Sequence, residues 1–388
     1  MPLRARATIN LAAIERNVTR LRSELSSRTA FCAVVKADGY GHGATMAARA
    51  AQSAGAGWLA VATAEEAAAL RRDGISGRLL VMGALSASEL EVALRAQADI
   101  VAWDDRFLAD VSAAIGREPS LGPARVHVKL DTGMGRLGTR LPERARELAE
   151  RAAAGGAGLT VAGAMTHLAT ADEEDREFMT LQLARFAAFV AELREAVPGI
   201  VVHAANSAAT LREPASHHDL VRCGIAIYGG DPANRDPADH GLEPAMALDS
   251  YVAAVRWTRP GESAGYGRRF TAGEETWLAT LPIGYGDGVR RAFTNNCDVL
   301  IGGHRHPLVG TVSMDNITVD LGPESRVEPG TPAVLIGRDG GERQTAEELA
   351  RRIGTINYEI ICGITARVPR EYHRDGVELA DASSTGPA

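Results

Sequence analysis

Eight short apolar segments, most of them separated by stretches with helical spacing, restrict the folds that the first 230 residues can adopt. They are rich in β-branched residues and cover residues 31–36, 58–62, 78–83, 99–103, 125–131, 159–167, 200–206 and 219–224. Apolar strands that alternate with helices are typical of a parallel sheet that is covered on both faces. Eight strands close a (β/α)8 TIM barrel, so we expect that fold; an open doubly wound sheet is the alternative.

The stretches between these strands show a clear helical pattern in three places. Apolar residues share one face over residues 11–25, where Asn10 is a candidate N-cap. Residues 64–74 are rich in alanine and end at a glycine, and residues 172–197 carry an apolar stripe at helical spacing. We expect a helix in each of the three.

The character of the sequence changes after Tyr228, where a loop with several prolines covers residues 229–244. Short segments with alternating polarity follow, which is typical of an antiparallel β domain. These segments are residues 246–257, 275–283, 297–301, 306–321 and 332–337. One short helix is expected at residues 345–354, because this segment opens with a T-x-x-E capping box.

The expected organisation is therefore α/β plus β, with two domains, which suits a chain of 388 residues. The (β/α)8 TIM barrel is expected at residues 9–235 and a mostly antiparallel β domain at 236–379. Residues 1–8 are expected to pair into the β domain, and residues 380–388 to form a flexible tail.

Composition and charge disfavour several classes of partner. The chain is 45% hydrophobic and 23% charged, as is usual for globular proteins. Its net charge of −7 and the lack of long basic runs argue against nucleic acid and membrane surfaces as partners. No apolar run is long enough to span a membrane, and the N-terminal sequence lacks the apolar region of a signal peptide.

Potential metal and disulfide ligands are sparse. Four cysteines are spread along the chain without a CxxC pair: Cys32, Cys223, Cys297 and Cys362. This spacing excludes zinc ribbons and thioredoxin-type motifs and fits reduced thiols in a cytoplasm. His304 and His306 have no third ligand nearby in the sequence, so we expect no metal site. The sequence thus indicates a cytoplasmic protein, and most naturally an enzyme.

Polar or ionisable residues end five of the eight predicted strands, which a purely structural barrel would not require. They are Lys36, Lys129, Asp131, His167, Asn206, Ser207 and Arg222. Because the carboxyl ends of barrel strands meet at one rim, we expect these residues to form an active site there. Each has an ordinary structural explanation when taken singly, such as a lysine that extends its amine into solvent.

Three of these strand ends together indicate a cofactor. A lysine desolvated at the rim, as expected for Lys36, becomes a nucleophile that can form a Schiff base. Asn206–Ser207 and Gly224–Ile225 follow the last two strands, where barrels commonly bind phosphate, although ordinary turn chemistry also explains these residues. A covalent anchor combined with an anion site is what pyridoxal phosphate requires.

Nine motifs, in the family's order and spread over nearly the whole chain, resemble those of the alanine racemases, which are pyridoxal phosphate enzymes of fold type III. The motifs are AVVKADGYGHG (33–43), VKLDTGMGRLG (128–138), MTHLATAD (165–172), ANSAAT (205–210), VRCGIAIYG (221–229), GYGRRF (265–270), LPIGYGDG (281–288), GTVSMDNITVDLG (310–322) and NYEIICGITARVPREY (357–372). The sequence is identified as a member of that family on these residues.

The resemblance implies how the cofactor is bound. Lys36 is expected to hold pyridoxal phosphate as a Schiff base, and Arg222 to face the pyridine nitrogen, with His167 beside both. The phosphate is expected to be bound by Tyr40, Asn206, Ser207, Gly224, Ile225 and Tyr358.

The resemblance also implies catalytic and substrate-binding roles. Lys36 and Tyr266 are expected to carry the proton on opposite faces of the substrate Cα. Arg136 and the backbone of Met314 are expected to hold the substrate carboxylate, with Tyr285 at the entrance. Lys129 matches a position that is carbamylated in some relatives.

The implied reaction is the interconversion of L- and D-alanine, which supplies D-alanine for peptidoglycan, in a homodimer whose chains share their active sites. A basic amino-acid decarboxylase or a broad-specificity racemase on the same fold is one alternative. A pyridoxal phosphate carrier without turnover is another. Tyr266 argues against the decarboxylase and the carrier, because decarboxylation needs no second base and such carriers resemble the barrel alone.

Overall fold

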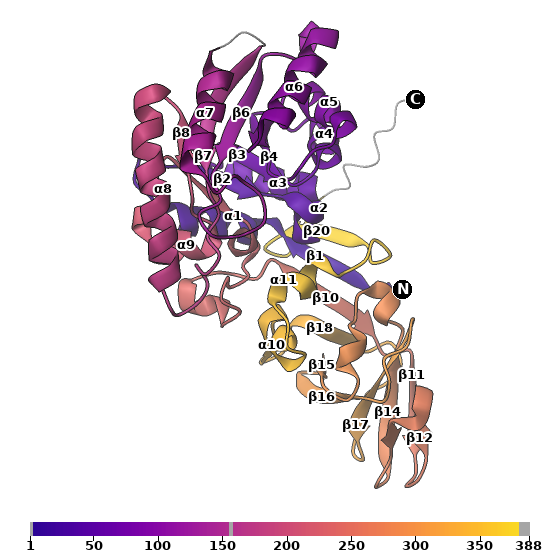
Figure 1. Cartoon of the computed structure of the whole chain (residues 1–388). Helices are drawn as coiled ribbons and strands as arrows, with labels where there is room; N and C mark the ends of the chain where they lie inside the picture. Colours follow the sequence, from indigo (N-terminus) through magenta and orange to yellow (C-terminus); the bar gives the residue numbers. More distant parts are fainter. Residues whose placement is uncertain (1–2, 155–157, 380–388) are drawn as a thin grey trace, which may run out of the picture. The chain divides into compact units, whose positions relative to one another are not determined.

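The structure is a computed structural model that describes residues 3–154 and 158–379 (Figure 1). It divides into two compact units: Glu15–Ile227, and the two ends of the chain up to Ile14 and from Tyr228 onward. The domain boundaries expected from the sequence, at residues 9 and 235, stay predictions. The flexible tail expected at 380–388, like Met1 and Pro2, lies outside the described residues.

The first unit contains an eight-stranded parallel sheet in the order β8-β7-β6-β5-β4-β3-β2-β9. Its strands are β2(Ala30–Val34), β3(Trp58–Val61), β4(Arg78–Val81), β5(Asp99–Ala102), β6(Ala124–Lys129), β7(Leu159–Met165), β8(Val201–His203) and β9(Leu220–Cys223). The backbone N–H groups of Asp219 and Arg222 donate to the carbonyls of Val202 and Ala205, each at 3.0 Å, between the β8 and β9 segments. The sheet is therefore a nearly closed barrel, as predicted, and the open doubly wound alternative is wrong.

Helices surround the barrel strands. They are α1(Leu11–Arg22), α3(Ala44–Ser53), α4(Ala64–Arg72), α5(Ala87–Arg95), α6(Asp105–Arg117), α7(Pro142–Ala153), α8(Glu177–Ala196) and α9(Ser207–Arg212). The Asn10 side chain accepts the Ala12 N–H at 3.1 Å, as an N-cap does. The helix expected from residue 172 begins only at Glu177, because the Asp175 carboxylate accepts the Glu177 N–H and forms a turn there.

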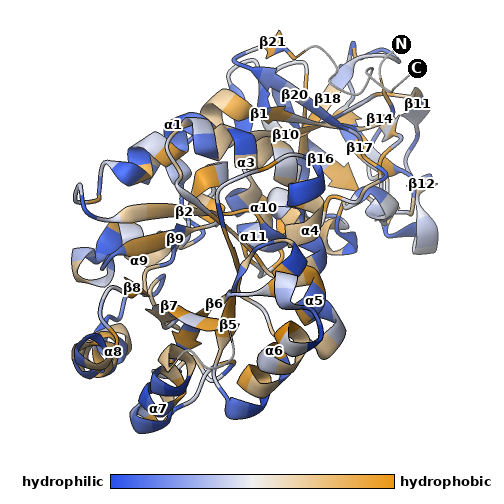
Figure 2. Ribbon diagram, turned by 90° about the horizontal axis from the view of Figure 1, so that it is seen from above, coloured by the Kyte–Doolittle hydropathy of each residue, from blue (hydrophilic) through white to orange (hydrophobic). Residues whose placement is uncertain are grey.

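The colouring by hydropathy explains why these elements assemble. In Figure 2 the barrel strands are mostly apolar, and the helices around them carry hydrophilic residues on part of their surface. Strands β3, β5 and β9 are buried at every position, as expected of a parallel sheet covered on both faces. Among the described residues, no helix has the length and apolar character needed to cross a lipid bilayer.

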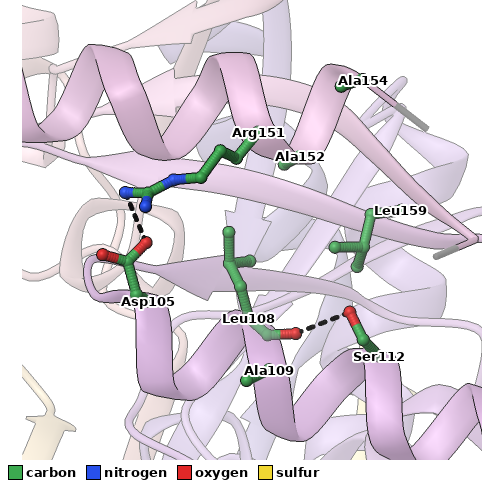
Figure 3. A pocket seen from close by; sticks show the side chains of 8 residues that line it. All are labelled: Asp105, Leu108, Ala109, Ser112, Arg151, Ala152, Ala154 and Leu159. Atoms are coloured by element: carbon green, nitrogen blue, oxygen red, sulfur yellow. Dashed lines mark hydrogen bonds and ion pairs between the residues drawn. The ribbon is translucent and has the colours of Figure 1, made fainter. Parts of the chain in front are cut away.

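A pocket lies between α6 and α7, where Leu159 at the start of β7 also lines it (Figure 3). An ion pair of 2.6 Å between Arg151 and Asp105 borders it, and the Ser112 hydroxyl donates to the Leu108 carbonyl at 2.9 Å. None of the site residues predicted from the sequence lines this pocket. It is therefore not the predicted active site.

The second unit is a mostly antiparallel β unit, as predicted. Its main sheet has the order β11-β14-β17-β16-β15-β18-β10-β1-β20-β21, with β19 paired to β18. The strands are β1(Arg6–Asn10), β10(Met246–Tyr251), β11(Ala254–Thr258), β14(Thr276–Leu281), β15(Asp298–Ile301), β16(His304–Val309), β17(Ile317–Gly322), β18(Pro332–Asp339), β19(Glu342–Gln344), β20(Arg370–Arg374) and β21(Val377–Glu378). Strand β1 pairs antiparallel with β10 and parallel with β20, so the start of the chain is part of this sheet.

Three details of the β unit differ from the sequence prediction. The segment 246–257, expected as one strand, is divided into β10 and β11, which pair with different neighbours, β10 with β1 and β18 and β11 with β14. The segment 306–321, expected as one strand, is divided into β16 and β17 by a loop that opens at Gly310, whose φ is +74°. The predicted helix at 345–354 is α10(Ala346–Arg352), and Thr345 caps it by accepting the Glu348 N–H at 3.2 Å. A second helix, α11(Asn357–Cys362), was not expected from the sequence.

Candidate active site

The barrel unit places ten of the predicted site residues at or just beyond the carboxyl ends of its strands. They are Lys36, Tyr40, Lys129, Arg136, His167, Asn206, Ser207, Arg222, Gly224 and Ile225. Lys36 follows β2, Lys129 ends β6, and Arg222 lies in β9. This end of the barrel therefore gathers cations, hydroxyls and backbone amides from several strands.

Lys36 opens an unusual turn, α2(Lys36–Tyr40). Ala37, Asp38 and Tyr40 each have a φ of +52°, and Gly39 has a φ of +60°. A left-handed conformation costs an L-residue about 1–2 kcal/mol. Three such residues in succession with a glycine therefore need partners from outside the turn.

Glu66 supplies such a partner, and Asp38 of the turn itself bonds to the start of α3. Glu66 Oε1 accepts the Ala37 N–H at 2.6 Å, while Oε2 accepts the N–H groups of Ala62 and Thr63 at 2.8 and 3.1 Å. Asp38 Oδ1 accepts the Ala44 N–H at 2.9 Å, where α3 begins. One carboxylate, that of Glu66, thus joins the turn that carries Lys36 to the loop after β3.

Replacing Glu66 by glutamine is expected to loosen the Lys36 turn, because an amide offers one acceptor oxygen where the carboxylate serves two loops. Glu89 is a matched control. It completes a capping box with Ser86 in α5 as Glu66 does with Thr63 in α4. The Glu89 carboxylate accepts hydrogen bonds from the N–H and the hydroxyl of Ser86, and so does not join two loops. Hydrogen–deuterium exchange over residues 36–43 should rise about tenfold or more in Glu66→Gln and stay unchanged in Glu89→Gln. Equal exchange in the two variants would contradict this role.

Residues after β8 and β9 form a cluster of neutral hydrogen-bond groups. The Ser207 hydroxyl accepts the N–H groups of Gly224 and Ala226 at 2.9 and 3.4 Å, and Ser207 opens α9 behind its N-cap Asn206. A Cβ on Gly224 would lie 2.3 Å from the Tyr40 hydroxyl oxygen. Only glycine therefore leaves room for the backbone to approach Tyr40 here, as an anion cradle requires.

Arg222 is almost fully buried, with an exposure of 3%. Its Nη1 donates to His203 Nδ1 at 2.8 Å, and its Nη2 donates to the carbonyls of Thr166 and Ala204 at 2.9 and 3.0 Å. Nη2 also lies 3.4 Å from His167 Nδ1. Burial lowers the pKa of Arg222 to about 10, so the guanidinium remains charged at neutral pH.

Several cations converge on this end of the barrel. Burial, and then the charges of Arg222, Arg136, Lys129 and Lys36, hold the pKa of His167 well below its usual value. Burial, followed by Arg222 and Arg136, lowers the pKa of Lys129 to about 8. Lys36 and Lys129 are the only lysines in the chain. This concentration of positive charge suits an anionic ligand.

The other four predicted residues belong to the β unit. Tyr266 opens a short turn between β12(Ser263–Ala264) and β13(Phe270–Thr271), and its carbonyl accepts the Thr311 hydroxyl at 2.7 Å. The Met314 carbonyl accepts the Gly286 N–H at 2.9 Å, next to Tyr285, and Tyr358 lies in α11. Tyr266, Tyr285 and Met314 are exposed, by 74%, 42% and 52%. Large side chains left so exposed are common where a partner or ligand binds.

Three further buried residues contact this site and were not expected from the sequence: Asp99, His127 and His203. His127 lies two residues before Lys129 on β6, so both side chains lie on the same face of the strand. A histidine buried between two valines of β6 was the available signal, but its partners are on other strands and leave no local pattern.

Two family models match the chain. Residues 9–232 match the model described as alanine racemase, N-terminal domain, and residues 245–372 match alanine racemase, C-terminal domain. Because the second domain is matched as well as the barrel, a carrier that resembles the barrel alone is excluded.

Individual relatives are similar in sequence to this chain over nearly their whole length. The alanine racemase of Symbiobacterium thermophilum is 44% identical over 369 residues, which cover 94% of this chain and 96% of the relative. That of Mycolicibacterium vanbaalenii is 42% identical over 371 residues, with 94% of each chain covered. The crystal structure of alanine racemase from the D-cycloserine producer Streptomyces lavendulae has a TM-score of 0.91 and 39% identity, covering 96% of this chain and 98% of that one.

Proposed function

This chain belongs to the alanine racemase family of isomerases, which interconvert L- and D-alanine and supply D-alanine for peptidoglycan, and we propose that Lys36 and Tyr266 are its two proton carriers. Inversion at Cα needs one group on each face, since a single group returns the proton to the face from which it came. The observation that most supports the role of Lys36 is the composition of the rim of the barrel. There the only two lysines of the chain, Lys36 and Lys129, lie with Arg136 and Arg222 around His167.

The residues at the rim fit pyridoxal phosphate as the cofactor. The space that a Cβ on Gly224 would fill, the Ser207 hydroxyl and the excess of positive charge suit its phosphate. Lys36 would hold it covalently through Nζ, and Arg222 and His167 would contact its ring. Its phosphate would be bound by Tyr40, Asn206, Ser207, Gly224, Ile225 and Tyr358. When bound, pyridoxal phosphate supplies the electron sink that acidifies the Cα proton of the amino acid.

Arg222 controls how strong that electron sink is. A guanidinium has no acceptor and stays protonated at neutral pH even with its pKa lowered to about 10. Arg222 would therefore keep a ring nitrogen that faces it unprotonated, which would make the bound cofactor a weaker electron sink and favour racemisation over transamination.

The remaining residues bind and orient the substrate. Arg136 and the backbone of Met314 would hold the carboxylate, with Tyr285 at the entrance. With the carboxylate fixed, Tyr266 removes the Cα proton of L-alanine and Lys36 delivers one to the opposite face. The roles are exchanged when D-alanine reacts.

Lys129 is proposed to be carbamylated. Carbamylation requires a neutral amine, and a pKa of about 8 leaves a large neutral fraction near physiological pH. The new carbamate anion would lie beside Arg136 and Arg222, whose charges lower the pKa of the amine. Intact-protein mass spectrometry with and without bicarbonate should show one added CO2 in the wild type and none in Lys129→Ala; addition of CO2 to both would contradict the assignment.

The active site is proposed to be shared between two chains of a homodimer, Lys36 coming from one chain and Tyr266 from the other. The high exposure of Tyr266, Tyr285 and Met314 in the single chain supports this arrangement.

The compartment that we propose is the reducing cytoplasm. All four cysteines are free thiols, and three of them are buried.

A complementation experiment tests both the assignment and the sharing. Lys36→Ala and Tyr266→Phe are each expected to be nearly inactive, but after mixing and re-association about a quarter of the wild-type activity should return. Half of the dimers would be mixed, and each mixed dimer would hold one intact site. If each chain supplies both residues of its own site, every site keeps one lesion and no activity returns. Size-exclusion chromatography controls for subunit exchange.

A further inference from the structure

A row of buried hydrogen-bonded side chains extends from Arg222 through the interior of the barrel. Arg222 Nη1 is 2.8 Å from His203 Nδ1, His203 Nε2 is 2.7 Å from His127 Nδ1, and His127 Nε2 is 3.2 Å from Asp99 Oδ2. Asp99, His127 and His203 have no exposed surface. The row joins β9, β8, β6 and β5, and it ends at the first residue of β5.

The two ends of the row determine where its protons lie. Arg222 can only donate, so His203 Nδ1 must be an unprotonated acceptor. Asp99, when ionised, can only accept, so His127 Nε2 must carry a proton. With both rings neutral, His203 then carries its proton on Nε2 and donates it to His127 Nδ1. All three N–H donors therefore point the same way, from the rim toward Asp99.

The surroundings of the row support these protonation states. Burial raises the pKa of Asp99, but hydrogen bonds from His127 and Arg125 outweigh it, so the net pKa is lowered. Burial is the largest cause that lowers the pKa of both His127 and His203. Arg125 Nε donates to Asp99 at 2.6 Å, and Arg78 lies 3.4 Å away, which stabilises the carboxylate. The titratable groups that act on His203 are Arg222, His127, His218 and Lys129, and all four disfavour a positive charge there.

A glycine makes the central contact of the row possible. Strand β7 lies between β6 and β8, and Gly163 is paired with His127 on one side and Val201 on the other. A Cβ on Gly163 would lie 2.4 Å from His127 Nδ1. Any other residue at this position would push the His127 ring away from His203.

We propose that Asp99, His127 and His203 form a directional hydrogen-bond relay that fixes the orientation of Arg222, with Gly163 as the residue that leaves room for it. This inference rests on the role of Arg222 given under the proposed function. The three are positioning residues: Arg78 and Arg125 pair with the Asp99 carboxylate, which fixes the tautomers of His127 and His203, so that His203 Nδ1 remains an acceptor for Arg222 Nη1.

The first test determines the tautomers of His127 and His203. Long-range ¹H–¹⁵N spectra of the full-length protein, with and without pyridoxal phosphate, report which ring nitrogen of each histidine is protonated. His127 and His203 should both be neutral with the proton on Nε2 from about pH 8 to 6, whereas an ordinary histidine titrates near 6.5. A proton on Nδ1 of either ring, or titration of either ring in this range, would overturn the relay.

The second test links the relay to turnover. Gly163→Ala keeps all four polar residues but separates His127 from His203. His127→Phe keeps an aromatic side chain at position 127 but removes both of its hydrogen bonds. Both should lower kcat about tenfold, as the loss of an outer-shell partner does at metal sites, raise the transaminated fraction and leave KM for alanine within about twofold. His217→Phe is the control, since His217 is also buried but donates to the Thr210 carbonyl outside the row.

The outcomes distinguish failure of the relay from failure of the proposed function. If the spectra are as expected but kcat and partitioning in Gly163→Ala match those of His217→Phe, the relay does not act on Arg222 and the proposal fails, while the racemase assignment stands. If the wild type does not racemise alanine, the proposed function fails whatever the spectra show. If His127→Phe does not fold, Gly163→Ala and the wild-type spectra still determine whether the relay acts on Arg222.

Discussion

Replacing Lys36 by alanine is expected to reduce kcat for racemisation in both directions on the order of 10³-fold or more, because the residue supplies both a covalent anchor and one of two proton carriers. The variant should also lose covalent attachment of pyridoxal phosphate. The chain makes the measurement unambiguous, since it has only two lysines, Lys36 and Lys129. After borohydride reduction, peptide mass spectrometry of the wild type should find the cofactor on the Lys36 peptide alone.

Lys129→Ala is the matched control for this experiment. It removes the other lysine of the rim but is expected to keep the label on Lys36. Label on Lys129 in the wild type, or undiminished racemisation by Lys36→Ala, would overturn the assignment of Lys36 and with it the cofactor geometry proposed above.

Replacing Tyr266 by phenylalanine is expected to have the second large effect. The change removes one oxygen from a side chain that is 74% exposed, so the stability of the chain should change little. Loss of a general acid–base group typically lowers kcat about 10²–10⁴-fold, and we expect a loss in this range in both directions. Because the two enantiomers have equal free energy, kcat/KM must fall by the same factor for L- and D-alanine. An unchanged melting temperature shows that the loss is chemical.

The barrel was predictable from the sequence because its strands are apolar on both faces. All eight predicted strands are present, since a segment buried on both sides has few polar residues to interrupt it. The ends of elements were less predictable. The helix expected from residue 172 starts at Glu177, and the strand expected at 306–321 is divided at Gly310, because a side-chain hydrogen bond and a positive φ act locally against the broader pattern.

The polar rim was also predictable, because residues such as Lys36 and Arg222 interrupt or end apolar strands. The left-handed turn after Lys36 was not, since Ala37 and Asp38 adopt a positive φ that neither residue favours by itself. Partners distant in the sequence, such as Glu66, stabilise that conformation. Local propensity carries no information about such a partner.

Two groups of functional residues carry no signal in their own residue chemistry. Tyr266 was identified only through the family resemblance, because an exposed tyrosine in a β-hairpin has no feature that marks it as a base. The buried histidines were missed for a different reason. His127 and His203 lie on strands that are not adjacent, and the gap between them depends on Gly163 of a third strand.

The central claim is that two groups serve opposite faces of one carbon atom, and solvent isotope exchange tests it without relying on net racemisation. In deuterated water, Tyr266→Phe should still exchange the Cα hydrogen of D-alanine through Lys36 and return deuterated D-alanine with little L-alanine. Exchange into L-alanine should collapse, because its proton is removed by Tyr266. Equal loss of exchange from both enantiomers, or equal retention in both, would contradict the division of labour between Lys36 and Tyr266.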